Sequence, residues 1–377
     1  MNTSDLHPAG HPDFAQQLAP WLQTQLERLL LQRGHAWLLA GPSGLGQFDL
    51  ALALATAWLC EQPEARGACG HCGSCHAVAV HTHADLCMLL PETLSLSLGW
   101  PLDEKTQDDL DSKKRKPSKE IKVDAARNAV EFTQFTRSRG STKVVLIFPA
   151  ERMNHITANT ILKTLEEPPG AVKFILATEA AHQLLPTIRS RCLGHTMSWP
   201  GFDEALEWLR EKTAGIVNPE SKPKKPLFPV AQEDLHTLLA SAGGRPENVL
   251  TWAKNIPVAD AARQWKSFPK AMARGEVSAL ADWAPALAVD SLQKLCHDMW
   301  AMHVGAAPRF FSADDLPELN SKKSDDVRQT VPDSGLPRLA EWYTDLCAIA
   351  RSVEHPYNPG LLIESLVSRA HLALTVN

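Results

Sequence analysis

The chain has 377 residues, of which 44% are hydrophobic and 21% are charged, with a formal net charge of -5 at pH 7. A chain of this length more often forms two or three domains than one, and the small negative charge excludes a global basic surface that would wrap nucleic acid. The N-terminus lacks a basic segment followed by an apolar one, and no later stretch has 18 uncharged apolar residues. We therefore expect a cytoplasmic protein with no membrane partner.

The first predicted structural unit contains a glycine-rich loop. An apolar run from Trp37 to Leu39 predicts a strand, and apolar residues that recur between residues 47 and 60 predict a helix. The loop between them carries Gly41, Gly44 and Gly46. A strand, a glycine-rich loop and a helix in this order are the context of a phosphate-binding loop.

The residues that complete such a nucleotide site are replaced. In a working loop a lysine reaches the phosphates and the next Ser or Thr holds Mg²⁺, but this chain has Gln47 and Phe48. The carboxylates expected after a second buried strand are replaced by Phe148 and Pro149. We therefore predict that the chain does not hydrolyse ATP and that its glycines persist as a tight turn, with residual nucleotide binding as the alternative.

Four of the eight cysteines, namely Cys60, Cys69, Cys72 and Cys75, fall within 16 residues. Two successive C-x2-C steps let thiolates reach neighbouring corners of a tetrahedron about 2.3 Å from Zn²⁺, so we predict a closed structural zinc site in a module at about residues 60–87. For the histidines and the aspartate nearby we do not favour a second metal site, because histidines beside a zinc site more often face solvent or surround its ligands. These residues are His71, His76, His81, His83 and Asp85.

Two further apolar runs, at residues 143–148 and 172–178, have the β-branched residues and the polar or Gly/Pro boundaries of buried parallel strands. Between them, the segment NHITANTILKTLEEPPG predicts a helix that Asn154 caps and Pro168 ends. Strands that alternate with helices predict a parallel α/β sheet in about the first 200 residues.

Two segments interrupt this pattern. Residues 101–120 carry an acidic block and then a basic block, which predicts a solvated, mobile insertion, with a nucleic-acid-binding arm as the alternative. Residues 218–229 form a Pro/Lys-rich loop between two helical patterns. From about Ala261 onward the periodicity is helical, so we expect an all-α region there.

Four segments carry a resemblance to a known family: IKVDAARNAVEF, GSTKVVLI, AERMNHITANTILKTLEEPPGAVKFILAT and LLPTIRSRC, the last of which ends in Ser-Arg-Cys at residues 190–192. Together they resemble the clamp-loader AAA+ subunits of bacterial DNA polymerase III, in which residues 190–192 match the SRC motif. The four-cysteine insertion is shared by the whole group. The resemblance is dense over residues 30–200, except at 101–120, and weaker beyond, where LLASAGGRPENVL is similar to the family's lid.

Within this family the chain resembles the delta-prime group, which lacks the loop lysine and the acidic pair but keeps the SRC motif. In the lid, Pro246 stands where active relatives carry a nucleotide-sensing arginine, although the neighbouring Arg245 leaves that alignment open. The resemblance thus implies a structural Zn²⁺ and no ATP bound in cis. It also implies a RecA-like AAA+ domain at residues 1–198, a small helical lid at 199–258 and an all-α oligomerising collar at 259–377.

The resemblance implies that Arg191 is an arginine finger for the ATP site of a neighbouring subunit, because a planar, permanently charged guanidinium can stabilise the transferring phosphoryl group. The implied complex is a pentamer of three gamma or tau ATPase subunits, a delta subunit and this chain, which loads a sliding clamp onto primed DNA. The alternatives are an intramolecular salt bridge for Arg191, an ATP-hydrolysing subunit of the same loader, and a zinc-dependent nucleic-acid-binding module. The role of Arg189 stays open.

Overall fold

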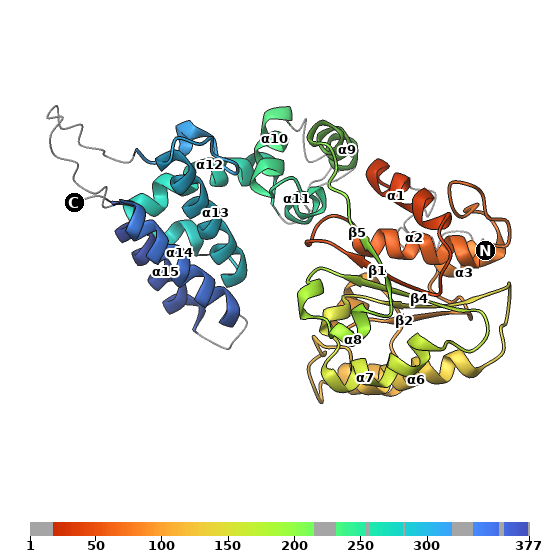
Figure 1. The fold of residues 1–377 in the computed structure, drawn as a ribbon. Coiled ribbons are helices and arrows are strands. Elements are labelled where there is room, and N and C mark those ends of the chain that lie inside the picture. Colours follow the sequence, from red (N-terminus) through yellow and green to blue (C-terminus); the bar gives the residue numbers. More distant parts are fainter. Residues whose placement is uncertain are drawn as a thin grey trace, which may run out of the picture. The chain divides into compact units, whose positions relative to one another are not determined.

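The computed structural model describes residues 18–214, 231–253, 256–281, 283–318, 335–353 and 358–375. The chain divides into two compact units, Met1–Pro200 and Gly201–Asn377, and most of their elements are labelled in Figure 1. The Pro/Lys-rich loop expected at residues 218–229 lies outside the described residues.

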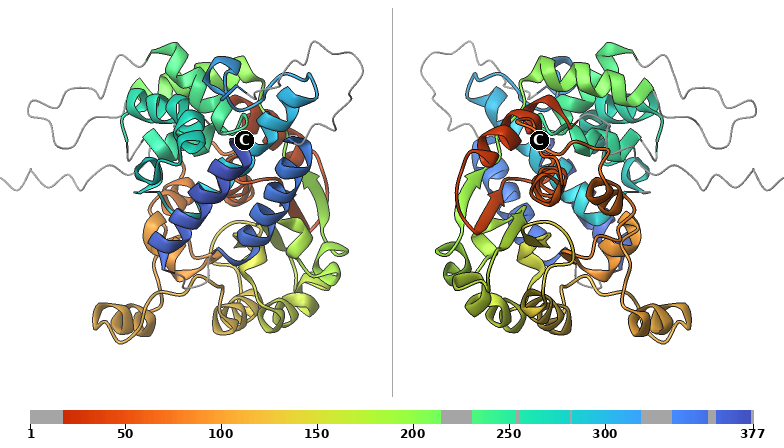
Figure 2. Two further views of the ribbon diagram at one scale, coloured as in Figure 1. Left: turned by 90° about the vertical axis from the view of Figure 1, so that its left-hand side faces the viewer. Right: turned by 90° about the vertical axis from the view of Figure 1, so that its right-hand side faces the viewer.

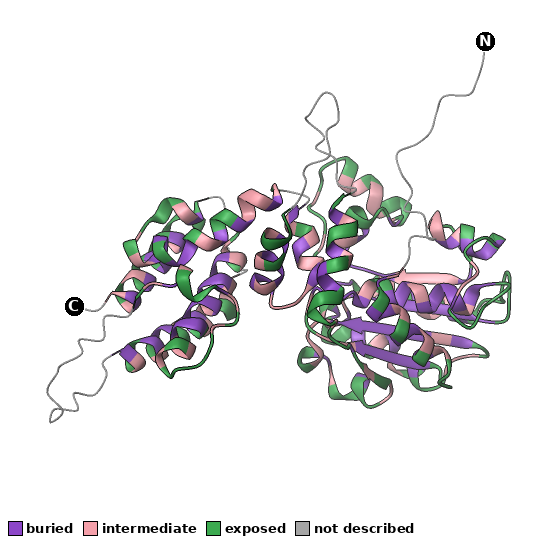
Figure 3. Ribbon diagram, turned by 90° about the horizontal axis from the view of Figure 1, so that it is seen from above, coloured by how far each residue is buried: buried purple, intermediate pink, exposed green. Residues whose placement is uncertain are grey.

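A five-stranded parallel sheet forms the centre of the first unit, with strand order β2-β3-β4-β1-β5. The strands are β1 (Ala36–Ala40), β2 (Leu86–Leu89), β3 (Lys143–Ile147), β4 (Val172–Thr178) and β5 (Leu193–Thr196). The sheet runs through the buried interior of this unit in Figure 3. The parallel α/β sheet predicted from the sequence is confirmed.

Helices cover both faces of this sheet, as Figure 1 shows, with α2 on one face and α6 and α7 on the other. Strand β3 is buried along its whole length, as a strand covered on both faces should be. The helices of this unit are α1 (Pro20–Leu30), α2 (Gln47–Leu59), α3 (Gly73–Ala79), α4 (Glu92–Leu98), α5 (Glu104–Asp111), α6 (Val123–Gln134), α7 (His155–Glu166) and α8 (Pro186–Arg189). Two short 3-10 turns are η1 (Ala150–Arg152) and η2 (Ala181–Gln183).

The helix between β3 and β4 begins as its sequence predicted. Asn154 caps α7, because its side-chain oxygen accepts a 2.9 Å hydrogen bond from the backbone N–H of Thr157. Ile161 and Leu165 of this helix are buried against the sheet. The predicted cap is confirmed; of the three apolar residues that helical periodicity places inward, Ile161 and Leu165 are buried and Leu162 is partly buried.

Strands β2 and β5 were absent from the sequence prediction. Each spans only four residues at an outer position of the sheet. In β5, with sequence LGHT, no residue is fully buried, so it lacks the apolar run that marks the inner strands. Pairing with β1, rather than local sequence, defines this strand.

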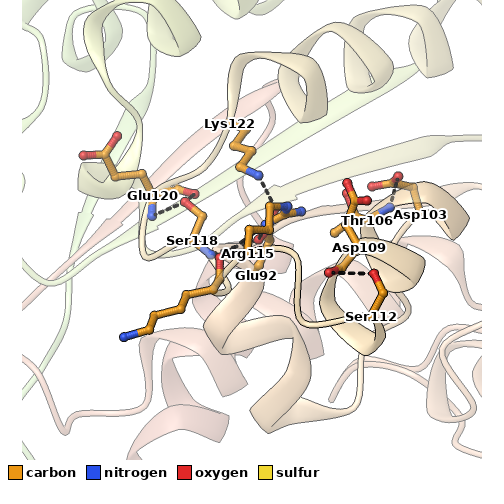
Figure 4. A network of polar contacts seen from close by, with 10 residues as sticks. Glu92, Asp103, Thr106, Asp109, Ser112, Arg115, Ser118, Glu120 and Lys122 are labelled. Carbon is orange, nitrogen blue, oxygen red and sulfur yellow. Dashed lines mark hydrogen bonds and ion pairs between the residues drawn. The ribbon is translucent and has the colours of Figure 1, made fainter.

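The charged insertion contains more structure than the sequence predicted. Helix α5 lies within residues 101–120 and has no buried residue, and the segment that carries α4 and α5 extends away from the sheet in Figure 2. Figure 4 shows the network that anchors its end, where the nearly buried Glu92 carboxylate accepts hydrogen bonds from Arg115 at 3.0 Å and from the Ser118 N–H at 2.9 Å. Lys122 Nζ lies 2.6 Å from the same carboxylate.

The second unit is helical throughout its described residues. Its helices are α9 (Phe202–Ala214), α10 (Gln232–Ser241), α11 (Pro246–Ala253), α12 (Val258–Arg274), α13 (Pro285–His303), α14 (Gly335–Ser352) and α15 (Pro359–Leu374), with 3-10 turns η3 (Val277–Leu280) and η4 (Ala313–Asp315). The all-α region expected after about Ala261 agrees with these helices. Among the described residues, none of the helices is long and apolar enough to cross a membrane.

This unit contains two hydrophobic cores that share one helix. Helix α12 contributes Val258 and Ala262 to a core with α9, α10 and α11. Farther along the same helix, Trp265 and Phe268 belong to a larger core with α13, α14 and α15. The boundary that the sequence placed near residue 258 therefore coincides with the start of a helix that takes part in both cores.

A buried carboxylate organises one edge of the larger core. Asp298 is fully buried and accepts hydrogen bonds from the backbone N–H groups of Arg309, Phe310 and Phe311, at 2.9, 2.7 and 2.9 Å. These bonds hold the Phe311 ring in a stack on Trp265, with ring centroids 4.4 Å apart. Backbone donors thus satisfy a charge whose burial would otherwise be costly.

The Glu92 network predicts an acid-sensitive contribution to stability. Burial alone would raise the pKa of Glu92, but hydrogen bonds from Arg115 and Lys122 lower it from 4.5 to about 2. Because the folded pKa is depressed, the contribution is present above pH 4.5 and is lost as pH falls toward 2. We expect Glu92→Gln to lower the free energy of unfolding by about 2 kcal/mol at pH 7.

Urea unfolding of the variant and the wild type at pH 7 and pH 3 checks this expectation, and the difference between the two proteins should shrink in acid. Glu104→Gln, at an exposed position of the same insertion, is the matched control and should leave stability unchanged. Equal stability of Glu92→Gln and wild type at pH 7 would contradict the anchoring role.

Candidate functional site

The glycine loop before α2 has conformational reasons for each of its glycines. Gly44 and Gly46 have φ values of 87° and 90°, which side-chain-bearing residues rarely adopt. At Gly41, an added Cβ would lie 2.7 Å from the Cβ of Met197, closer than two carbon atoms can approach without displacement. The fold alone accounts for these glycines.

Gln47 turns its side-chain amide back into this loop. Its Nε2 donates hydrogen bonds of 2.7 Å to the carbonyl oxygens of Gly41 and Pro42, and the residue is only 2% exposed. A lysine at the same place would extend a cation toward a phosphate. The amide instead satisfies the loop's own backbone and holds the turn closed.

Phe48 and Phe148 meet in space although 100 residues separate them in the sequence. Phe48 lies in the first turn of α2 and Phe148 directly follows β3, and their ring centroids are 5.4 Å apart in a tilted arrangement. Aromatic pairs of this kind contribute about 0.5–1.5 kcal/mol beyond the area that they bury. Apolar packing thus joins the two positions where the sequence analysis expected Mg²⁺ ligands.

The carboxylate nearest to the end of β3 in the sequence is also engaged. Glu151, in η1, accepts a 2.7 Å hydrogen bond from the Thr178 hydroxyl and a 3.0 Å bond from the Glu179 N–H. Both of its oxygens therefore tie η1 to the end of β4. This contact has a structural role that the sequence did not reveal.

The four clustered cysteines converge as predicted. Their sulfur atoms all lie within 4.8 Å of one another, and three of the pairs are 3.5, 3.8 and 4.0 Å apart. Four sulfurs about 2.3 Å from a central Zn²⁺ would be separated by roughly 3.8 Å. The four thiols of Cys60, Cys69, Cys72 and Cys75 therefore fit a tetrahedral metal ion.

Backbone hydrogen bonds prepare part of this cluster for a thiolate. Burial acts to raise the pKa of the Cys72 thiol, but hydrogen bonds from the backbone of Cys75 and Glu61 outweigh it and lower the pKa to about 6. Burial raises the pKa of Cys75. A thiol that coordinates a metal is deprotonated, so four bound thiolates would repel one another. A bound cation would offset this repulsion.

The histidines near the cluster make separate contacts. His71 pairs with the carbonyl of Cys69, and His81 pairs with the carbonyl of Gly99 and stacks on Trp100. His83 accepts a 3.1 Å hydrogen bond from the backbone N–H of Asp85. Within the described residues, the four cysteines form the only group with metal-ligand spacing, so these contacts do not favour a second metal site.

Arg191 follows α8, and its guanidinium lies against the end of α7. Nε donates a 3.1 Å hydrogen bond to one carboxylate oxygen of Glu166, Nη2 lies 3.0 Å from the same oxygen in an ion pair, and Nη1 donates to the Thr187 carbonyl at 2.9 Å. The intramolecular salt bridge that the sequence left open as an alternative is therefore present in the single chain. The two side chains are 31% and 55% exposed, and pairs at such positions contribute about 0–1 kcal/mol, so a phosphate can compete for the guanidinium.

Arg189 is placed differently from Arg191. It ends α8 and is exposed, and among the described residues no ion pair to its guanidinium is present. The two arginines of the segment thus differ in how firmly the chain orients them.

Sequence reasoning missed the carboxylate partner of Arg191. Glu166 lies 25 residues before Arg191, on another helix. Its position beside the prolines that end α7 was visible, but helical periodicity carries no information about a contact over that separation. Likewise, the sequence indicates that Gln47 replaces a lysine, but it does not indicate that the Gln47 amide bonds to the carbonyls of the glycine loop.

Comparisons with known proteins find relatives among the subunits of DNA polymerase III. A family model described as "DNA polymerase III, delta subunit" matches residues 15–198. The DNA polymerase III subunit delta' of Pseudomonas aeruginosa is 37% identical over 229 residues, which cover 60% of this chain and 58% of that protein. The subunit delta' of Escherichia coli is 29% identical over 296 residues, which cover 73% of this chain and 76% of that protein. A DNA polymerase III subunit tau, from Salmonella typhimurium, is 31% identical over 186 residues, which cover 49% of this chain and 24% of that protein.

The cysteine cluster predicts a metal-dependent module. We expect about one Zn²⁺ per purified chain, and Cys72→Ser should lower both the metal content and the melting temperature, because metal binding is coupled to the folding of such sites. Elemental analysis and thermal unfolding check this expectation. Cys347→Ser, outside the cluster, is the matched control. A metal-free preparation with wild-type stability would contradict the assignment.

Proposed function

Because the chain belongs to the DNA polymerase III delta-prime family, we propose that it is a clamp-loader subunit that does not hydrolyse ATP and that donates Arg191 to the ATP site of a neighbouring subunit. The chain spans 58% of the length of the Pseudomonas aeruginosa relative that it matches. The activity and the partners of the whole relative are therefore carried over to this chain only as a proposal.

The observation that carries the proposal is the contact between Phe48 and Phe148. Transfer of a phosphoryl group requires cations and hydrogen-bond donors around the phosphates and carboxylate or hydroxyl ligands for Mg²⁺. Here two aromatic rings pack together at those positions, and the Gln47 amide bonds to the loop carbonyls. The loop thus keeps the shape of a phosphate-binding loop but lacks the cation and the metal ligands that phosphoryl transfer requires.

The placement of Arg191 supports the second half of the proposal. Within the chain it makes two hydrogen bonds and one ion-pair contact, and a guanidinium has five N–H donors, so each terminal nitrogen keeps at least one N–H group for another acceptor. The side chain is also partly exposed, next to the end of α8. A phosphate oxygen of a neighbouring subunit's ATP is an acceptor of the required charge and geometry.

The proposed partners are the gamma or tau ATPase and the delta subunit, with the sliding clamp and primed DNA reached through the complex. We assign residues 199–258 to a lid and residues 259–377 to a collar that binds the other subunits. Exposed apolar side chains on the larger core of the second unit support a contact surface there. They are Val304, Leu361 and Leu372, each more than 60% exposed.

The cysteine cluster is proposed to hold a structural Zn²⁺. The four thiols would complete the tetrahedron, which leaves no open position for a substrate. The backbone N–H groups of Cys69 and Cys75 donate to the sulfurs of Cys60 and Cys72 at 3.3 and 3.4 Å, which favours thiolate ligands. In this proposal the metal supports the fold and takes no part in phosphoryl transfer.

The loop geometry predicts that the isolated chain does not bind ATP. Isothermal titration calorimetry with ATP and Mg²⁺ should show no saturable binding, because Gln47 and Phe48 supply neither a cation nor a metal ligand. The partner ATPase subunit is the positive control. Tight, Mg²⁺-dependent binding by the isolated chain would favour an ATP-hydrolysing subunit instead.

The finger assignment predicts the effect of Arg191→Ala in the reconstituted loader. If three ATP sites act independently and one loses its finger, the steady-state ATPase rate should fall by about a third, because fingers in trans accelerate phosphoryl transfer by about 10³–10⁵. Arg189→Ala is the matched comparison on the same segment and should leave the rate closer to wild type. An unchanged rate for an assembled Arg191→Ala loader would remove the proposed role.

A further inference from the structure

We propose that Glu166 is the positioning residue for Arg191. This inference rests on the proposed function, since it concerns how the finger is presented. Glu166 is the last residue of α7, and one of its oxygens accepts a 3.1 Å hydrogen bond from Nε of Arg191 and lies 3.0 Å from Nη2. The Thr187 carbonyl accepts from Nη1. Three contacts from two elements thus fix both the plane and the direction of the guanidinium.

The contacts leave part of the guanidinium available. Nε has one N–H group, and it is used by Glu166. Nη1 and Nη2 have two N–H groups each; Nη1 donates one to the Thr187 carbonyl, and Nη2 makes its ion-pair contact with Glu166. At least one N–H group therefore remains on each terminal nitrogen. A carboxylate that holds the Nε side lets Arg191 present both terminal nitrogens to a phosphate.

The helix by itself disfavours a carboxylate at the position of Glu166, the last residue of α7. The C-terminal end of a helix carries a partial negative charge, which destabilises an acidic side chain there. Arg191 supplies the compensating cation. The carboxylate therefore makes its favourable contact with the finger and not with its own helix, as expected for a residue whose role is to orient Arg191.

Orientation matters because a flexible arginine loses entropy when it binds a phosphate. A guanidinium already held in one plane loses less of that freedom, and a catalytic group displaced by even 1 Å can lose much of its effect. Removal of Glu166 should therefore reduce catalysis at the neighbouring ATP site without changing how that site binds ATP.

The experiment compares variants of the full chain in the reconstituted loader. The measured quantity is the Arg191-dependent part of the ATPase rate, defined as the difference between wild type and Arg191→Ala. We expect Glu166→Ala to lower this part about two- to five-fold, the range that an exposed ion pair supports. The change should appear in kcat, with KM for ATP unaltered.

Three further variants separate positioning from a structural effect. Glu166→Gln keeps an acceptor oxygen and should lose less rate than Glu166→Ala, and by removing a carboxylate from the helix end it should not lower the melting temperature. Glu167→Ala, at the adjacent exposed glutamate, is the matched control and should match wild type. The double variant Glu166→Ala with Arg191→Ala should equal Arg191→Ala alone, because Glu166 acts through Arg191.

The outcomes distinguish this inference from the proposed function. If Arg191→Ala lowers the rate but Glu166→Ala leaves it unchanged, the finger stands and the positioning role is wrong. A rate for Glu166→Ala above wild type also overturns positioning, since it would show that Glu166 restrains the finger. If Arg191→Ala has no effect in an assembled loader, the proposed function fails and this inference fails with it.

Discussion

The contact between Phe48 and Phe148 is the interaction on which the rest of the first unit's chemistry depends. It joins the first turn of α2, which directly follows the glycine loop, to the end of β3. Apolar packing there removes the need for a bound cation to neutralise buried charge, because no carboxylate faces the loop from Phe148. The same contact leaves the loop without the groups that phosphoryl transfer requires.

A working nucleotide site combines a loop of the right shape with charged groups. In this chain the shape lies in the glycine loop and the charge lies in the segment that carries Arg191. The glycines, Gln47 and the aromatic pair keep the shape of the strand-to-helix turn. The charge lies instead at Arg191, on a segment that follows α8 and is paired with Glu166. A weak, partly exposed ion pair orients a side chain without sequestering it, which supports the proposed contact of Arg191 with a neighbouring subunit.

Two buried carboxylates in this protein are satisfied by direct contacts with donor groups. Glu92 is held by Arg115, Lys122 and a backbone N–H, and Asp298 by three successive backbone N–H groups. Each carboxylate fixes a connecting segment to a helix, the end of the charged insertion in one case and the loop after α13 in the other. These contacts explain how segments with few apolar residues keep a defined path.

The sequence by itself determined the features that depend on neighbours along the chain: the inner strands, the Asn154 cap of α7, the four-cysteine cluster and the missing lysine, since periodicity, capping and ligand spacing are local. Only the tertiary structure decided which distant residues meet. It defined β5 by pairing with β1, brought Phe48 to Phe148 and Arg191 to Glu166, and let α12 serve two cores. Such contacts arise when the sheet and its covering helices close, and short-range patterns do not encode them.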